Sequence, residues 1–219
     1  MNNIIEVNEK EKDLLFEMAR KGKYLGAGVE GTCYLSKDEF GSLEAVKILD
    51  KMSDFYHCAD NVIMDSTFGL KSFAFPKKVY SQNGEVVSYT ARYYNDFLKP
   101  NSDGIPFIIN TELLKNAISR FIDDLKILSF YGIYLNDLGF NLVFDNYNLV
   151  AIDTLNYTYK DHDTFDENIE VLKAALKNIF RYGCEALLDT DINFDEEINR
   201  LVEIKNETYM KKYTKTISR

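Results

Sequence analysis

The stretch from Tyr131 to Thr154, YGIYLNDLGFNLVFDNYNLVAIDT, restricts the possible folds of this chain more than any other. Two short apolar runs, Leu142–Phe144 and Leu149–Ile152, flank four turn-forming residues at 145–148, a pattern that predicts a β-hairpin. A polar loop precedes the hairpin, and Asp153 directly follows its second run. The hairpin therefore ties that loop to Asp153 as one rigid β-turn-β unit.

Three side chains within 17 positions of this stretch can bind a divalent cation or accept a proton: Asp137, Asn141 and Asp153. Mg²⁺ takes hard oxygen ligands from one or two side chains and completes its shell with water and phosphate. Asn141 and Asp153 are suitable ligands, and Asp137 is suited to orient a hydroxyl nucleophile. Asp and Asn are also common in loops because they stabilise turns, so the rest of the chain must decide between a functional site and an ordinary turn.

The second informative stretch is KYLGAGVEGTCYL, in which Gly26, Gly28 and Gly31 form a GxGxxG pattern. A dinucleotide-binding loop of this pattern needs a helix directly after its glycines. Here the β-prone residues 32–35 follow, and turn formers come next, which predicts strand, glycine loop, strand and turn. Glycines let such a loop lie close over phosphates, where a Cβ would clash.

The run Leu43–Leu49, LEAVKIL, predicts the next strand, and Lys47 stands in it among apolar residues. A lysine in this setting ordinarily runs its apolar stem along the strand and reaches water with its ammonium group. Lys47 lies 16 residues after Gly31, however. A strand paired to the glycine-loop hairpin would point this ammonium beneath the loop, toward the α- and β-phosphates of ATP.

Glycine loop, A-V-K strand, D-x-x-x-N loop and a later I-D strand end, in that order, resemble the protein kinase fold over residues 24–154. The short chain resembles the minimal bacterial kinases, such as the small effector kinases injected into host cells. The resemblance implies an α+β, two-lobed protein-kinase-like fold in one domain. Residues 1–96 would form an antiparallel β-sheet N-lobe with an N-terminal helix, and residues 97–219 a reduced, mainly helical C-lobe.

The resemblance also implies an enzyme that uses ATP and Mg²⁺ to phosphorylate Ser or Thr of a protein substrate. Lys47 and Asp137 would be catalytic, Lys47 by clamping phosphates and Asp137 by orienting the acceptor hydroxyl. Asn141 and Asp153 would hold the metal. The residues implied to lie around the nucleotide are Gly26, Ala27, Gly28, Gly31, Cys33, Ala45, Lys47, Asp65, Tyr93, Asn95 and Val143.

Two of these positions carry further expectations. Asp65, on a helix expected within Ser53–Leu70, is the implied acidic partner of Lys47, and Asp60 is the alternative. The segment from Tyr93 to Phe97 is the implied hinge whose backbone binds adenine.

The central loop departs from the family pattern. Asn141 comes four steps after Asp137 where the family has five, and Leu135 occupies the family's His position. An alternative alignment places Asn136 at the catalytic base, which would make the chain a pseudokinase, a protein-binding module. The family's D-F-G is here Asp153-Thr154-Leu155, and its missing glycine favours a fixed metal loop.

The remaining elements follow from periodicity and turn residues. Asn8 and Glu11 resemble a capping box, and Asn83-Gly84 is a strong tight-turn signal. We expect a hairpin at 73–93 and helices at Asn8–Arg20, Thr111–Ser129, Asp163–Leu188 and Phe194–Tyr213.

Bulk properties restrict the function further. A net charge of -9 argues against binding nucleic acid through its phosphates and requires any nucleotide site to be locally positive or to carry a metal. Three separated cysteines cannot form a disulfide framework, and two histidines argue against a His-based metal site or catalytic triad. No apolar run reaches the ~20 residues of a membrane span, and the N-terminus lacks a signal-peptide pattern. We expect a cytoplasmic protein, or one exported into a host cell without such a signal.

No activation segment or A-P-E motif is recognisable after Asp153. The expected partners are therefore a protein substrate and, for switching, a host or partner activator. A small-molecule kinase of the aminoglycoside-modifying type is a third possibility, although such enzymes usually surround their substrate with a larger helical lobe.

Overall fold

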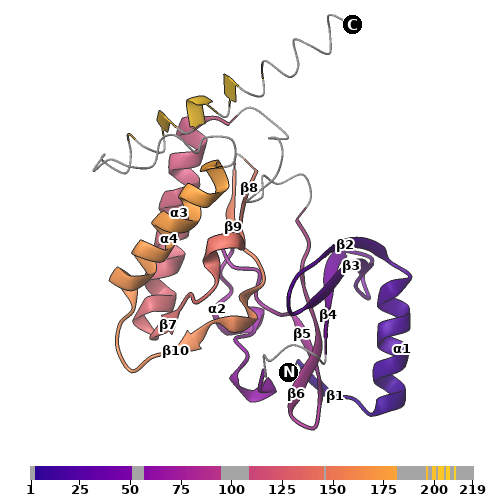
Figure 1. Ribbon diagram of the computed structural model, residues 1–219. Coiled ribbons are helices and arrows are strands. Elements are labelled where there is room, and N and C mark those ends of the chain that lie inside the picture. Colours follow the sequence, from indigo (N-terminus) through magenta and orange to yellow (C-terminus); the bar gives the residue numbers. More distant parts are fainter. Residues whose placement is uncertain are drawn as a thin grey trace, which may run out of the picture. The chain divides into compact units, whose positions relative to one another are not determined.

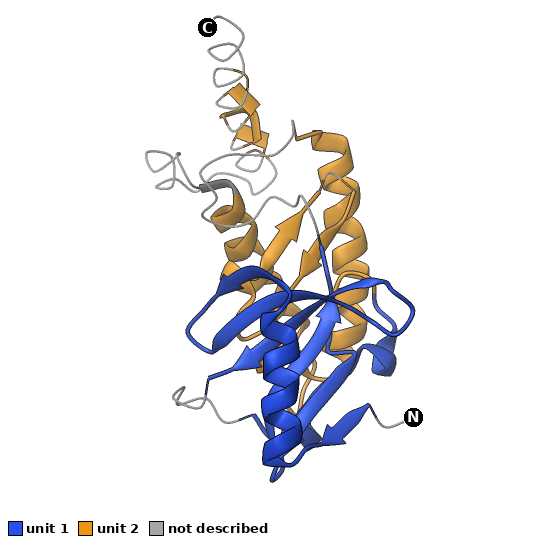
Figure 2. Ribbon diagram, turned by 90° about the vertical axis from the view of Figure 1, so that its right-hand side faces the viewer, with its two compact units in different colours: residues 1–70, 74–95 blue, residues 71–73, 96–219 orange. Residues whose placement is uncertain are grey.

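The computed structural model describes residues 3–50, 57–94, 109–145 and 147–181, and separate positions between 196 and 210. The protein is α+β and divides into two compact units (Figure 2). Unit 1 comprises residues 1–70 and 74–95, and unit 2 comprises residues 71–73 and 96–219. No helix among the described residues is both long and apolar enough to cross a membrane.

Unit 1 is built on one six-stranded sheet with the order β1-β5-β6-β4-β3-β2 (Figure 1). Its strands are β1 Ile4–Glu6, β2 Lys23–Ala27, β3 Gly31–Lys37, β4 Leu43–Leu49, β5 Lys78–Gln82 and β6 Glu85–Arg92. The expectation of an antiparallel sheet was wrong at one edge, because β1 runs parallel to β5 and makes the sheet mixed. Glu6 stabilises this edge by accepting hydrogen bonds from Ser81 Oγ (2.6 Å) and Asn83 N (2.6 Å).

Helix α1, Glu9–Arg20, confirms the helix predicted from the capping box. Asn8 Oδ1 accepts a hydrogen bond from Glu11 N (3.1 Å), while Glu11 Oε2 accepts one from Asn8 N (2.9 Å), so two otherwise unpaired amides at the helix start are satisfied. Ala19 packs in a cluster with Val46 and Ile48, which places α1 on one face of the sheet (Figure 2).

Two of the hairpins of unit 1, β2–β3 and β5–β6, confirm their turn signals. Strands β2 and β3 pair antiparallel around the glycine loop, where Gly28 N donates to Gly31 O (2.9 Å). Between β5 and β6, Asn83 (φ 54°) and Gly84 (φ 78°) both adopt left-handed conformations, as a two-residue hairpin turn requires.

The helix expected within Ser53–Leu70 was wrong over its described part, residues 57–70. That part holds only a 3₁₀ turn, Ala59–Asn61, and the one-turn helix α2, Asp65–Phe68. Residues 57–59 instead pair with the end of the β5–β6 hairpin: Val86 N donates to His57 O (2.9 Å), and Ala59 N donates to Gly84 O (3.0 Å). Backbone hydrogen bonds to the hairpin therefore fix residues 57–59 in a path that is not α-helical.

Unit 2 combines two long helices with short strands. Its elements are α3 Thr111–Phe130, β7 Ile133–Tyr134, η2 Leu138–Phe140, β8 Leu142–Phe144, β9 Leu149–Ala151, η3 Thr154–Asn156, β10 Thr158–Tyr159 and α4 Phe165–Arg181 (Figure 1). Strands β8 and β9 confirm the predicted central hairpin, and α3 confirms the predicted helix and its buried stripe. Helix α4 begins at Phe165, two residues later than expected, and residues 182–188 lie outside the described part. The described positions of the final predicted helix have helical backbone.

A short segment of unit 2 comes from between two elements of unit 1. Ala151 N donates to Ser72 O (2.8 Å), and Ser72 N donates to Asp124 Oδ2 (2.9 Å). The neighbouring Phe73 side chain is fully buried, with its ring 4.9 Å from that of Phe121. Ser72 and Phe73 are therefore buried in unit 2, although the hairpin prediction had placed Phe73 with β5 and β6.

Candidate functional site

The predicted polar loop of unit 2 closes on itself as a compact turn. Asp137 and Asn141 flank the 3₁₀ turn η2, whose Leu138 is fully buried and anchors the loop. Asn141 Nδ2 donates to Asp137 O (2.8 Å) and to Asp137 Oδ2 (3.1 Å). The four-step spacing thus brings the two predicted functional side chains into direct contact.

The β8–β9 hairpin carries Asp153 to the same end as Asn141. Leu142 pairs with Ala151 in the ladder, and just beyond it Ile152 N donates to Asn141 O (2.7 Å). Asp153 follows immediately in a left-handed conformation (φ 56°, ψ 52°) and begins the 3₁₀ turn η3. A non-glycine residue rarely adopts this conformation, and Asp is among the few types that tolerate it, so the backbone reverses sharply where the predicted metal ligand stands.

Tyr157 lies close to both carboxylates. Burial raises the pKa of its phenol, and the negative charges of Asp137 and Asp153 raise that pKa further. The phenol therefore stays neutral at physiological pH. Its ring packs edge-on against Phe73, with a centroid distance of 6.3 Å. Neither aromatic was predicted as part of the site, because an isolated Tyr or Phe carries no motif.

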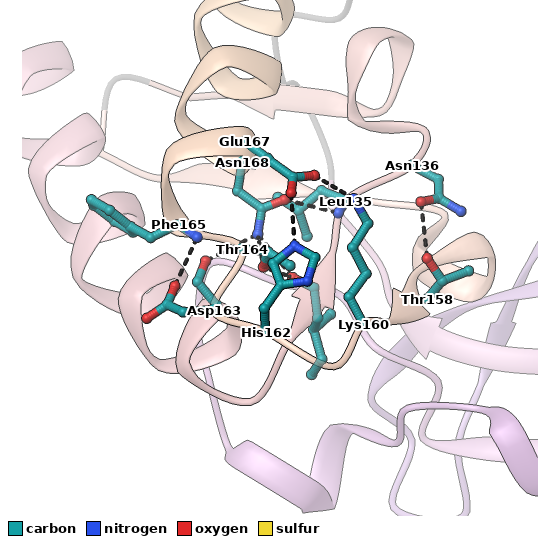
Figure 3. A network of polar contacts seen from close by, with 12 residues as sticks. Leu135, Asn136, Thr158, Lys160, His162, Asp163, Thr164, Phe165, Glu167 and Asn168 are labelled. Atoms are coloured by element: carbon teal, nitrogen blue, oxygen red, sulfur yellow. Dashed lines mark hydrogen bonds and ion pairs between the residues drawn. The ribbon is translucent and has the colours of Figure 1, made fainter.

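The strand that leads into the loop is held by a buried amide (Figure 3). Leu135, at the position of the family's His, is buried, and its backbone N–H donates to Asn168 Oδ1 on α4 (3.0 Å). Asn168 has 0% exposure, and its Nδ2, which carries two hydrogens, lies within hydrogen-bond distance of Ile133 O (2.8 Å), Thr164 Oγ1 (2.9 Å) and Ser129 Oγ (3.0 Å). One side chain thus connects the loop's entry strand to both long helices.

Asn136, the alternative position of the catalytic base, takes part in a different contact. Its Oδ1 accepts a hydrogen bond from Thr158 Oγ1 on β10 (3.1 Å), as Figure 3 shows. Asp137, not Asn136, is the residue bonded to Asn141. The geometry therefore favours the alignment that makes Asp137 the base.

The residues present fit a magnesium ion. A backbone carbonyl only accepts hydrogen bonds, so the amide nitrogen of Asn141 must face Asp137 O, and its Oδ1 points away from that contact. Asn141 Oδ1 and the Asp153 carboxylate are hard oxygen ligands on adjacent hairpin ends. Among the described residues no group of three His, Cys, Asp or Glu side chains gathers for a metal.

An exposed polar cluster lies at the start of α4 (Figure 3). His162 Nε2 lies 2.9 Å from Glu167 Oε1, and its Nδ1 lies 3.0 Å from Asp161 Oδ1. Both contacts raise the pKa of His162, that with Glu167 the more. Lys160 also pairs with Glu167.

In unit 1, three predicted nucleotide-site residues share one face of the sheet. Cys33 on β3 lies directly opposite Lys47 on β4, and directly opposed residues project from the same face. Ala45, two residues along β4, projects from that face as well. The alternate residues of β4, Val46 and Ile48, pack with α1. Lys47, Cys33 and Ala45 therefore lie on the face that α1 does not cover.

The acidic partner of Lys47 differs from the expected one. Lys47 Nζ lies 3.0 Å from Glu30 Oε2, and the two side chains are only 6% and 11% exposed. Asp65 instead pairs with Arg92 (2.8 Å), and the alternative, Asp60, is exposed in its 3₁₀ turn. Asp65 lies in the one-turn helix α2, and its partner there is Arg92, not Lys47. The one signal for Glu30 was a lone carboxylate within a glycine loop.

The glycines of the loop differ in what they permit. A Cβ at Gly31 would lie 2.0 Å from Ile48 O, so close strand packing requires glycine there. A Cβ at Gly26 or Gly28 would meet nothing within 4 Å, so the fold of unit 1 does not require these two glycines to be small. The space beside them suits a ligand that approaches the backbone closely.

The positions of the other residues predicted to contact the nucleotide say less about a nucleotide site. Ala27 is exposed at the end of β2, and Tyr93 is half-buried just after β6. Val143 is buried in β8 of unit 2. Asn95 lies outside the described residues.

Scanned against models of protein families, the chain matches none, and a search of curated proteins finds no match either. What this chain does must therefore be inferred from the two groups of residues: Asp137, Asn141, Asp153 and Tyr157 in unit 2, and Lys47, Glu30, Cys33 and Ala45 in unit 1.

Proposed function

We propose that the chain is a minimal two-lobed protein kinase that transfers the γ-phosphoryl group of ATP to a serine or threonine hydroxyl. The observation that carries the proposal is the closed loop in which Asn141 Nδ2 holds Asp137 by its backbone (2.8 Å) and by its carboxylate (3.1 Å). A carboxylate held in this way, close in the chain to two metal-suited oxygens, supports the role of a positioned base.

In this proposal the glycine loop covers ATP and Lys47 contacts its α- and β-phosphates. Asn141 Oδ1 and Asp153 would hold Mg²⁺, which when bound offsets the negative charge of the phosphates. Asp137 accepts the proton of the acceptor hydroxyl as that oxygen bonds to the γ-phosphorus. The bond from phosphorus to the β,γ-bridging oxygen breaks, and the products are a phosphoester and ADP. Positioning and charge stabilisation supply most of the catalysis.

The competing function is a pseudokinase, a protein-binding module that transfers no phosphate. Leu135 in place of the family's His favours it, since the loop then lacks one side chain of the family pattern. The contact between Asp137 and Asn141 weighs against it, because a loop that had lost catalysis would have no need of an oriented carboxylate.

Labelled ATP separates the two functions in an autophosphorylation assay that also contains a generic protein substrate. The wild type should incorporate phosphate, and Asp137→Ala should lose roughly 100-fold or more, the range for removing a general base. Lys47→Ala and Asp153→Ala should also lose activity. Asp123→Ala is the matched control, because Asp123 is an exposed carboxylate of the same unit that pairs with Lys126 on the surface of α3. Incorporation that survives all three site substitutions would defeat this assignment.

Binding is tested first, by thermal shift with ATP in the presence and absence of Mg²⁺. The kinase proposal requires a shift that depends on Mg²⁺ and falls in Asp153→Ala. A protein that ATP does not stabilise under either condition would instead be a binding module. Turnover of a small-molecule acceptor without any protein substrate would point to a small-molecule kinase.

The proposal extends to regulation and partners. Without an activation segment, activity is constitutive or is switched on by a partner protein, and the site of action is the cytoplasm of the producing cell or of a host. Dependence of activity on phosphorylation of the chain's own loop would contradict this.

A further inference from the structure

The glycine loop contains a buried carboxylate. Glu30 is only 8% exposed, whereas its neighbour Val29 is 84% exposed. A glutamate in a surface loop normally keeps its charge in water, and burying it is costly unless a partner compensates. The loop is therefore shaped to turn this one side chain inward.

The compensating partner is Lys47, whose Nζ lies 3.0 Å from Glu30 Oε2. His57 Nε2 lies 3.9 Å from the other carboxylate oxygen of Glu30. The backbone of Glu30 is also fixed, because Asp50, the residue just after β4, donates its N–H to Glu30 O (2.9 Å). Glu30 thus joins the loop to β4 through both its side chain and its backbone.

The carboxylate expected to position Lys47 is committed elsewhere. Asp65 Oδ1 accepts a hydrogen bond from Arg92 Nη2 (2.8 Å), and the same guanidinium nitrogen donates to Leu70 O (2.6 Å). Arg92 therefore ties the first residue of α2 to the backbone just after that helix, and the partner of the Asp65 carboxylate is this guanidinium group.

We propose that Glu30 is the positioning residue for Lys47, in the role that the sequence led us to expect of Asp65. This inference rests on the proposed kinase function. It means that the loop that covers the phosphates also orients the lysine that contacts them. Closing the loop and aligning Lys47 are then a single event, with no swing of a separate helix.

Binding of ATP with Mg²⁺, measured by isothermal titration, tests the role. Glu30→Gln should weaken binding roughly 10- to 100-fold, the loss expected when a hydrogen bond to a charged group is removed. Asp65→Asn is the matched control, because it makes the same carboxylate-to-amide change in the same unit, and it should bind within about threefold of the wild type. Glu30→Asp keeps the charge and should recover part of the loss. In a Lys47→Met background, Glu30→Gln should cause no further loss.

Thermal unfolding without nucleotide tests the pairing independently of any activity. Each single substitution, Glu30→Gln or Lys47→Met, leaves a buried charge without this partner, whereas the double substitution leaves neither charge. The double variant should therefore unfold at a higher temperature than the less stable single variant. If Glu30→Gln alone fails to fold, the unfolding temperatures of Glu30→Asp and of the double variant still test the pairing.

The outcomes distinguish the two proposals. If the wild type binds ATP and Glu30→Gln binds it equally well, the role of Glu30 is overturned and the kinase proposal stands. The same holds if Asp65→Asn weakens ATP binding more than Glu30→Gln does. Strictly additive losses of stability would overturn the pairing itself. A wild type that binds no ATP would overturn the kinase proposal, and this inference with it.

Discussion

Replacing Asn168 tests how the proposed catalytic loop is held in place. The side chain is fully buried and contacts four groups: the backbone N–H of Leu135, the carbonyl of Ile133 and the hydroxyls of Ser129 and Thr164. Asn168→Ala would leave the Leu135 N–H without this acceptor. Ile133 O is less affected, since Thr164 Oγ1 still donates to it (2.7 Å).

The cost follows from these partners. A buried polar group left unsatisfied costs about 1–3 kcal/mol, and here the Leu135 N–H and the Ser129 hydroxyl both lose a partner. The expected loss is therefore roughly 2–5 kcal/mol, a large part of the 5–15 kcal/mol that stabilises a typical domain. The loop that Leu135 enters should loosen as well, because the lost hydrogen bond lies two residues before Asp137.

Urea unfolding measures this loss, with Asn136→Ala as the control. Asn136 is exposed and accepts one hydrogen bond, from Thr158, so its replacement should cost less than about 1 kcal/mol. Asn168→Asp is a second probe, since its carboxylate can still accept from Leu135 N but cannot donate to Ile133 O. If Asn168→Ala costs no more than Asn136→Ala, the buried amide does not hold the loop and this reasoning fails.

Three further predictions concern other positions. The folded-state pKa of Tyr157 is raised above its unfolded value of about 10, so the contribution of Tyr157 to stability should be constant below pH 10 and be lost above it; when unfolding is measured against pH, the fall above pH 10 should be shallower in Tyr157→Phe. Gly31→Ala should lower the melting temperature because its Cβ would collide with Ile48 O. Gly28→Ala should keep the wild-type melting temperature and weaken ATP binding, and equal effects of the two variants on melting temperature would contradict the difference in packing. Asn8→Ala should cost about 1 kcal/mol through loss of the capping box, and an unchanged unfolding curve would show that α1 does not depend on it.

The elements predicted correctly are those whose signals are local. The capping box of α1, the Asn83-Gly84 turn and the β8–β9 hairpin are each encoded within a few residues. The contact between Asp137 and Asn141 could also have been predicted from local sequence, because a loop of four steps keeps the two side chains close together. Local chemistry decides such features before tertiary packing acts.

The elements missed depend on pairing between distant segments. Strand β1 has only three residues and forms because β5, more than 70 positions later, accepts it as a parallel neighbour. The helix expected around Asp65 gave way to pairing with the β5–β6 hairpin. The Lys47–Glu30 pair spans 17 positions and forms only because the loop folds inward. Neither periodicity nor motif spacing carries such information.

Phe73 decides how the protein can be divided. The lobe boundary predicted near residue 96 suggests that a fragment beginning at 97 would fold alone, but residues 71–73 belong to unit 2. Such a fragment would lack the aromatic ring that packs on Phe121 and the backbone carbonyl that pairs with Ala151. Its interior would contain a hole the size of a phenylalanine side chain. No single cut of the chain therefore separates the two units, because residues 71–73 of unit 2 lie between the two stretches that form unit 1.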